Sequence, residues 1–389
     1  MTPVLRPRRP ALLAATLACA LAAIPLLAGC GQASDPSPAA TIGSGAVAGA
    51  SPGATVGVPT GDGPSARGSA SAPLPPILPA TPARPAAIRG PLGGDLLIAD
   101  RGNARLLIVA PDRRILWSMQ LAPPGPGAIN LGADDAFFTP DGRHIIVNEE
   151  GRNVLALIDI ATKRIVWQYG HPGAAGAAPG YLNTPDDAYQ LPDGTITVAD
   201  INNERILFIS PNGSVVRQYG RTGLRRHDPP HAYAAPNGDT PLPDGGMLVT
   251  EIGGSWVDRL DSHGRLVWSV HLAGISYPSD AQLLPDGNVL VADYSYPGRI
   301  EEVTPKGRVV WRYAVTSGPG TLDHPSLAAP LPNGNIVAND DFNDRVVVID
   351  PTTNRIVWQY GHTGIAGTGR GYLNTPDGLN LAPANLVLP

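Results

Sequence analysis

The sequence predicts an all-β chain built from six copies of one four-stranded antiparallel unit. The first observation is a strand pattern that returns every 42 to 51 residues. Its second strands are centred on Ile98, Val147, Val198, Val249, Val291 and Val337. The second observation is a tight-turn signature, Pro-Asp-Gly or Pro-Asn-Gly, which begins at Pro140, Pro192, Pro243, Pro285 and Pro332. Gly and Asn adopt the left-handed backbone that such turns need, and a unit of this length accommodates four short strands.

Residues 1–29 have the pattern of an export signal. A basic stretch at residues 6–9 precedes an apolar stretch at residues 11–27, which is typical of a secretory signal peptide. The sequence Leu-Ala-Gly-Cys at residues 27–30 resembles the lipobox of bacterial lipoproteins. That resemblance implies lipidation of Cys30 and an extracytoplasmic protein anchored through this lipid to the bacterial cell membrane. An ordinary cleaved signal peptide is the alternative interpretation.

Charge and cysteine content exclude several functions. The chain has 389 residues, a net charge of −5 and two cysteines. A nucleic-acid-binding protein normally carries a basic face, so we expect no nucleic-acid partner. Both cysteines, Cys19 and Cys30, precede the repeats. The repeats therefore contain no disulfide, no Cys-ligated zinc and no Cys nucleophile.

A linker separates the export signal from the repeats. Residues 30–85 are mostly Ala, Ser, Gly, Pro and Thr, and because this composition cannot bury a core we expect a disordered stalk. The repeats occupy residues 86–389, with boundaries near 86–132, 133–184, 185–236, 237–277, 278–324 and 325–376. Residues 377–389 begin another unit and stop short. We expect them to close a ring onto the first unit; a seventh unit is left open.

Three residue types recur at fixed places in the unit, and we interpret them as scaffold. An Asp-x-x-Asn turn follows the second strand at residues 100–103, 200–203 and 340–343. The residues after these turns, which we expect to hydrogen-bond between units, are Arg105, Arg205, Arg299 and Arg345. The fourth strand carries a residue that we expect to pack between sheets, namely Trp117, Trp167, Trp268, Trp311 and Trp358, with Arg217 in the third unit.

The repeat resembles that of the NHL class of β-propellers. The match lies in Gln-Tyr-Gly-His-Pro-Gly at residues 168–173 and in residues 184–206, which include Pro-Asp-Gly-Thr-Ile-Thr-Val-Ala-Asp. Residues 350–358 also resemble the wider quinoprotein-like propellers. The resemblance covers residues 86–389 and implies a six-bladed β-propeller in which each unit is one blade. It implies no single activity, because such propellers include enzymes, ligand-binding proteins and scaffolds.

An uneven set of polar residues precedes the first strand of each blade. In a propeller this strand lines the central channel, and loops at one mouth of the channel form the usual binding face. One position holds Asp134, Asp186, Asn237, Ser279, Ser326 and Asp377. The next position holds Asp135, Asp187, Gly238, Asp280, Leu327 and Gly378, with Asp239 one residue further on.

We expect these residues to form an acidic ring at one mouth. Converging carboxylates raise one another's pKa unless a cation relieves them. Oxygen ligands at a concave mouth suit Ca²⁺ or another hard cation, or a cationic or hydroxylated ligand. The candidate metal ligands are Asp134, Asp135, Asp186, Asp187 and Asp280. The candidate ligand-binding residues are Asp135, Asp187, Asp239, Asp280, Asp377 and His231. The alternative is that each Asp caps its own loop by accepting backbone N–H groups.

Histidine is the side chain best suited to acid–base chemistry at neutral pH. His324 and His231 precede the first strands of blades six and four. Similarity to quinoprotein-like arylsulfotransferases, which use a His, makes His324 the candidate catalytic residue, although no cluster of basic residues for a sulfate accompanies it. The loop at residues 221–231 differs most from the repeat pattern; we interpret it as solvated, with an anion or partner site as the alternative.

The favoured function is therefore a cell-surface lipoprotein that binds a protein, glycan or small-molecule ligand at the channel mouth. The alternative is a propeller enzyme, a lyase, hydrolase or sulfotransferase, with His324 and the acidic ring at its centre.

Overall fold

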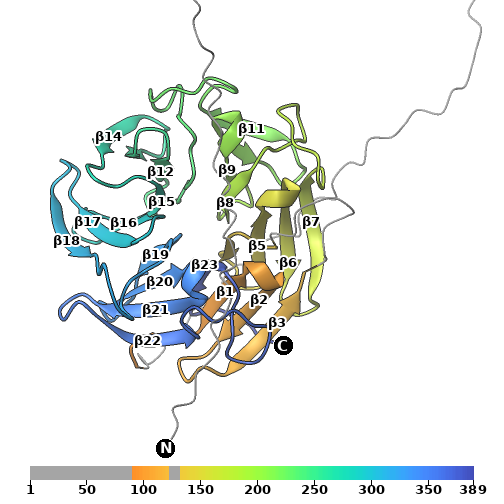
Figure 1. Cartoon of the computed structure of the whole chain (residues 1–389). Helices are drawn as coiled ribbons and strands as arrows, with labels where there is room; N and C mark the ends of the chain where they lie inside the picture. The colour runs from red at the N-terminus through yellow and green to blue at the C-terminus, as the bar shows by residue number, and fades with distance from the viewer. Residues whose placement is uncertain (1–89, 122–131) are drawn as a thin grey trace, which may run out of the picture. The chain divides into compact units, whose positions relative to one another are not determined.

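A computed structural model describes residues 90–121 and 132–389 (Figure 1). The predicted signal peptide, Cys30 and stalk lie outside these residues. The described part is an all-β chain whose sheets surround a common centre, and it is a six-bladed β-propeller. In these same residues no helix is both long and apolar enough to span a membrane.

Each blade is one antiparallel sheet whose strands follow one another along the chain, except that blade one takes its inner strand from the C-terminal segment. Blade one contains β23 (Pro376–Leu381), β1 (Leu96–Asp100), β2 (Arg105–Val109) and β3 (Ile115–Gln120). Blade two contains β4 (Ala136–Phe138), β5 (His144–Glu149), β6 (Val154–Asp159) and β7 (Arg164–Gly170). Blade three contains β8 (Pro185–Gln190), β9 (Ile196–Asp200), β10 (Arg205–Ile209) and β11 (Val215–Tyr219).

The second half of the ring repeats this plan. Blade four contains β12 (Met247–Glu251), β13 (Trp256–Leu260) and β14 (Leu266–His271). Blade five contains β15 (Pro278–Leu283), β16 (Val289–Asp293), β17 (Arg299–Val303) and β18 (Val309–Tyr313). Blade six contains β19 (Ala328–Pro330), β20 (Ile336–Asp340), β21 (Arg345–Asp350) and β22 (Arg355–Gly361). Short 3₁₀ turns follow four of the second strands: η1 (Arg101–Asn103), η2 (Glu150–Arg152), η3 (Ile201–Asn203) and η4 (Asp341–Asn343).

The last strand closes the ring, as predicted. β23 pairs with β1, so that Leu381 lies opposite Leu96 and Leu379 opposite Ile98. This pairing completes the sheet of blade one and makes the number of blades six. Without this pairing, β1 and β23 would each present an unpaired strand edge.

Blade four departs from the predicted four-stranded plan. Its inner segment pairs with β12 only at two isolated positions, Pro236 opposite Glu251 and Pro241 opposite Met247. Backbone hydrogen bonds such as that from Asn237 N to Thr250 O keep the segment beside β12. Because proline has no backbone N–H to donate, neither end of this segment can donate a ladder hydrogen bond.

The Trp side chains join neighbouring blades, which confirms their predicted role. The indole N–H of Trp117 donates to the carbonyl oxygen of Ile160 at 2.9 Å, and that of Trp358 donates to Pro111 at 2.9 Å. Blade three has Arg217 at this place, over the ring of Phe208. A groove of about 360 Å³ lies there, between blades three and four.

The recurring Asp and Arg residues are also scaffold. In blade three, Arg205 Nε donates to Asp200 Oδ2 at 2.7 Å, and the same guanidinium reaches the carbonyl oxygen of Tyr181 at 3.3 Å. Arg105 and Asp100 repeat the arrangement in blade one. Each arginine thereby ties the hairpin of its own blade to the loop that arrives from the preceding blade, as predicted.

Candidate functional site

Irregular pairing of the inner strands brings successive acidic residues to one end of the channel. In β8, Asp186 lies opposite Ala199 and Ala188 opposite Val198, so that Asp187 is an extra residue. The pairing of β15 and of β23 shifts at the equivalent place. A bulge bends the strand and re-aims the side chains that would otherwise alternate between faces. The predicted acidic positions therefore coincide with bulges.

A pocket of about 200 Å³ lies at this end of the channel. It is lined by side chains from blades one, two, three and five: Arg101, Asp134, Glu150, Asp186, Tyr277, Ser279, Tyr294 and Asp377. We call this pocket the acidic mouth. Four of its side chains are carboxylic acids and one is a cation, so its ionised form carries a net negative charge.

Arg101 in η1 organises the acidic mouth. One guanidinium nitrogen lies 2.7 Å from Asp134 Oδ1, and a second donates to Glu150 Oε2 at 2.7 Å. The guanidinium also contacts Asp377. These three carboxylates raise the pKa of Arg101 although its burial acts in the opposite direction. One permanent cation thus links blade one to blade two.

Three acids of the mouth are close enough to share a ligand. Oxygen atoms of Asp134, Asp135 and Asp186 all lie within 4.8 Å of one another. Burial raises the pKa of each carboxyl well above its usual value, and the neighbouring acids add to the rise. Protonation or a bound cation would relieve this repulsion.

A second tier of acids continues from the mouth and contains Asp187, Asp239 and Asp280. Burial raises the pKa of Asp187 well above its usual value, and the Asp280 and Asp239 charges add to the rise. Burial also raises the pKa of Asp280 to about 6, opposed by hydrogen bonds from Gln282 and Thr240. Asp187 Oδ2 and both carboxylate oxygens of Asp239 make no hydrogen bond of good geometry within the described chain.

The structure therefore brings most of the predicted residues together. Asp134, Asp186 and Asp377 line the mouth, and Asp135 lies beside them. The second tier adds the remaining predicted acids. These are Asp187, Asp239 and Asp280. His231 is exposed and makes no side-chain hydrogen bond to the acids among the described residues. Whether any of these residues binds a ligand stays a prediction.

Close packing explains why some positions of the predicted acidic ring hold glycine instead of an acid. A Cβ atom on Gly378 would lie 2.6 Å from the Cα atom of Asp135, and one on Gly238 would lie 3.1 Å from Asp187 Oδ2. Glycine at these positions lets the acids of the next inner strand approach. The absence of an acid there reflects space between strands rather than the needs of a ligand.

The residues that follow the second strands also contribute to the mouth, which was not predicted from the sequence. The residue directly after that strand reaches the mouth from several blades, as Arg101, Glu150 and Tyr294 do. Asp341 occupies the same place in blade six, where its carboxylate accepts a hydrogen bond from Ser326 at 3.0 Å. The six equivalent residues are Arg101, Glu150, Ile201, Ile252, Tyr294 and Asp341. The residue type at this position varies between blades as much as it does at the acidic positions, so an alignment of this position would have identified these residues.

The candidate catalytic residue lies beside the mouth. His324 Nδ1 is 2.6 Å from Asp323 Oδ1, and the imidazole packs edge-to-face on the Tyr294 ring at 4.8 Å between centroids. Tyr294 lines the mouth, whereas His324 does not. The ring of Tyr294 therefore stands between the two.

Two arginines of the loop after blade three are paired with acids of the same chain. Arg225 lies 3.2 Å from Glu204, and Arg226 contacts Asp228. The alternative of an anion or partner site in this loop stays a prediction.

Comparisons with known proteins support the propeller. Residues 253–376, in blades four to six, match the PQQ-type repeat family described as outer membrane protein assembly factor BamB. A protein of unknown function from Bacteroides caccae is 22% identical, with a TM-score of 0.53, and the match covers 74% of this chain and 97% of that one. A chain in a nidogen/laminin complex is 13% identical, with a TM-score of 0.51, and the match covers 75% and 99%. A search of curated proteins gave no match. At these identities the structural likeness establishes the fold alone.

Proposed function

We propose that the protein is an extracytoplasmic binding propeller, anchored by a lipid at Cys30, that binds a cationic ligand at the acidic mouth. The observation that carries the proposal is the charge of the mouth, where four carboxylic acids and one arginine line about 200 Å³. The family description that matches residues 253–376 names an outer membrane protein, which is in keeping with this location.

Calcium is the simplest cation that suits the mouth. Ca²⁺ takes carboxylate and carbonyl oxygens in flexible arrangements, and the grouped oxygens of Asp134, Asp135 and Asp186 are of this kind. A bound cation would also remove the mutual repulsion that raises the pKa of each of these acids. A ligand with an ammonium or guanidinium group would be attracted by the same charge.

Anionic ligands fit the mouth poorly. Its cation, Arg101, already contacts Asp134, Glu150 and Asp377. A sulfate or phosphate would meet these carboxylates at close range, and like charges repel most strongly where burial lowers the local dielectric. This argues against a sulfotransferase.

The decisive experiment measures Ca²⁺ binding by calorimetry and by thermal unfolding of the purified full chain after chelator treatment. We expect Ca²⁺ to raise the melting temperature, and Asp186→Asn to weaken binding by at least about 10-fold because one charged oxygen ligand is lost. Asp112→Asn is the matched control, since the Asp112 side chain is 66% exposed and lies outside the mouth. The absence of binding, or equal binding by Asp186→Asn, contradicts the cation site.

One observation favours a second candidate, an enzyme. Asp323 holds His324 through Nδ1 and leaves Nε2 for a substrate, which is the arrangement of an oriented general base. A screen of lactones, sulfoesters and glycans tests it. Turnover that His324→Ala abolishes would support the enzyme, and no turnover would leave the binding function.

The lipid anchor has its own test. Cys30→Ser should release the protein from the membrane fraction of expressing cells, because the lipidated residue is lost. Cys19→Ser is the control, since Cys19 lies within the expected signal peptide. Continued membrane retention of Cys30→Ser would contradict lipidation.

A further inference from the structure

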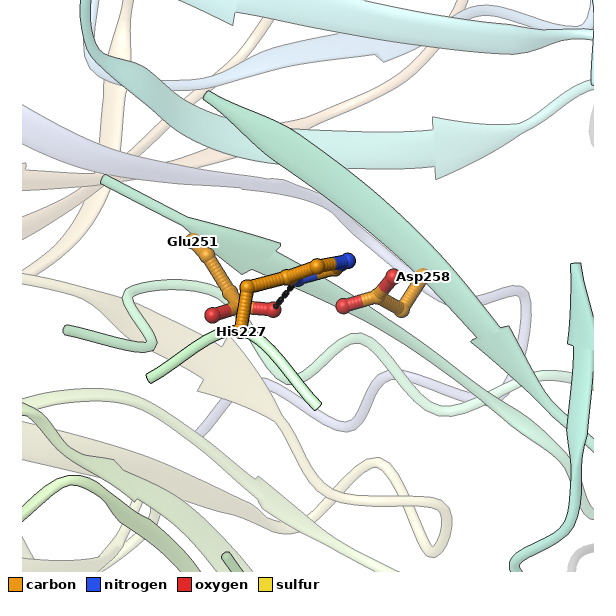
Figure 2. A group of neighbouring side chains, drawn as sticks. All are labelled: His227, Glu251 and Asp258. Carbon is orange, nitrogen blue, oxygen red and sulfur yellow. Dashed lines mark hydrogen bonds and ion pairs between the residues drawn. The ribbon is translucent and has the colours of Figure 1, made fainter. Parts of the chain in front are cut away.

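The loop after blade three places a histidine between two carboxyl groups of blade four (Figure 2). His227 Nδ1 lies 2.6 Å from Glu251 Oε1 at the end of β12, and Asp258 in β13 faces the imidazole. One donor atom from each of the three residues lies within 4.8 Å of the others. The Trp256 ring stacks on the imidazole at 4.0 Å and fixes its plane.

Part of this cluster replaces the scaffold pair of other blades. Glu251 occupies the place that Asp200 has in blade three, but Trp256 stands where the paired Arg205 would be. His227 supplies the missing partner from outside the sheet. The contact between His227 and Glu251 alone therefore needs only a structural explanation.

Asp258 has no such explanation. The equivalent third position of the strand is apolar in blades one and three, where Leu107 and Leu207 occupy it. Blade five has Glu301 there, and Arg312 donates to it at 2.7 Å. Asp258 has 0% exposure, and neither of its oxygens makes a hydrogen bond of good geometry in the described chain, although the Glu251 carboxyl and the Ser269 hydroxyl lie within reach of it. Two buried carboxyl groups that face each other are costly unless a cation or a proton relieves their repulsion.

We propose that His227, Glu251 and Asp258 bind a divalent transition-metal ion of the Zn²⁺ class. One imidazole nitrogen with two carboxylates is a ligand set that Zn²⁺, Mn²⁺ and Fe²⁺ accept. The Ser269 hydroxyl lies 3.2 Å from His227 Nε2, which is the outer partner that orients a metal-bound imidazole and leaves Nδ1 for the ion.

Metal binding requires only small movements of the donor atoms. Zn²⁺ ligands at about 2.0–2.2 Å lie roughly 3.3–3.5 Å apart in a tetrahedron. The ion would enter where His227 Nδ1 and Glu251 Oε1 now share a proton at 2.6 Å. Its two positive charges would balance the two carboxylates. Because His227 belongs to the loop and its partners to the sheet, the bound ion would cross-link the connection between blades three and four.

The full chain, freed of metal by a chelator, is loaded with Zn²⁺ or Co²⁺, separated from free ions and analysed for metal content. We expect about one ion per chain and, with Co²⁺, visible absorption typical of a low-coordinate site. Asp258→Leu should abolish loading while keeping the fold, since the repeat accepts leucine at this position. Asp258→Asn, which keeps the shape of the side chain, should lower metal affinity by at least about 10-fold.

His144 offers the matched control. Its imidazole also lies between two carboxylates, at 3.1 Å from Asp141 and 3.8 Å from Asp159, but outside this cluster. His144→Gln and Asp186→Asn should leave loading unchanged, and the second variant separates this site from the acidic mouth. The proposal is overturned if the wild-type chain retains no ion, or if Asp258→Leu or Asp258→Asn loads as well as the wild-type chain does.

Discussion

The guanidinium of Arg101 lies 2.7 Å from Asp134 Oδ1, and this ion pair joins the end of β1 in blade one to the entry of blade two. The two residues meet where β23 closes the ring, because Asp377 of that strand contacts the same guanidinium. One contact thus links the closure of the propeller to the charge of its mouth.

Replacing Arg101 by methionine should destabilise the protein by about 2–4 kcal/mol at pH 7, since three carboxylates would lose a buried cation. Urea unfolding in the presence of a chelator measures the loss. Added Ca²⁺ should restore part of it if a cation binds the mouth. Arg114→Met is the control, because that side chain is 62% exposed and its replacement should cost less than about 0.5 kcal/mol. Equal stability of the two variants would contradict the role of Arg101.

The metal-free protein should lose stability as the pH rises. Burial raises the pKa of Asp280 to about 6 and that of Glu251 to about 7 in the folded state, whereas unfolded values are near 3.9 and 4.3. The folded state therefore binds more protons between these limits, so its stability is full below pH about 4 and declines up to pH about 7.

Urea midpoints at pH 5 and pH 8 in a chelator measure this decline. We expect a difference of at least about 1 kcal/mol in favour of pH 5. Asp280→Asn should make the difference smaller, since its amide does not titrate. Stability that increases from pH 5 to pH 8 would show that other titrating groups dominate.

Gly378→Ala should weaken the closure of the ring. Its Cβ atom would lie 2.6 Å from the Cα atom of Asp135, and backbone cannot move aside as a side chain can. We expect a loss of about 1–3 kcal/mol in thermal or urea unfolding. Gly369→Ala is the control, because its nearest neighbour would be 3.6 Å away. A loss confined to the control would contradict the close approach of the inner strands.

Arg217→Trp should stabilise the protein by filling the groove between blades three and four. Tryptophan occupies this place in other blades, and the indoles of Trp117, Trp311 and Trp358 donate a hydrogen bond to the next blade. Filling a groove of this kind typically contributes about 0.5–2 kcal/mol. Arg217→Ala removes the guanidinium without filling the groove, so it separates the two effects. A lower melting temperature for Arg217→Trp than for Arg217→Ala would show that the groove does not accept an indole.

The fold could be predicted because its signals are local. The Pro-Asp-Gly turns, the strand lengths and the Asp–Arg pairs each involve residues close in sequence, and the six copies reinforce one another. The irregular inner segment of blade four was not predicted, because only the structure shows that the prolines at 236 and 241 lie at its two pairing positions with β12.

The candidate site could be predicted in part. Aligning the first strands identified Asp134, Asp135 and Asp186, which the structure brings together. Arg101 escaped notice because it lies in a turn that otherwise has a structural role, and the cluster around His227 escaped because its members come from three different segments.

The sequence by itself determined the repeat and the strand expected to close the ring, since these depend on turns and strand patterns along the chain, whereas the structure decided that the ring has six blades. Only the tertiary structure decided which charges meet. Arg101 and Asp377 are 276 residues apart in sequence and become neighbours through ring closure. Asp258 lies in a strand position that is apolar in blades one and three, and it faces His227 because a loop folds over the sheet. Electrostatic partners depend on distance in space, which strand patterns leave undetermined.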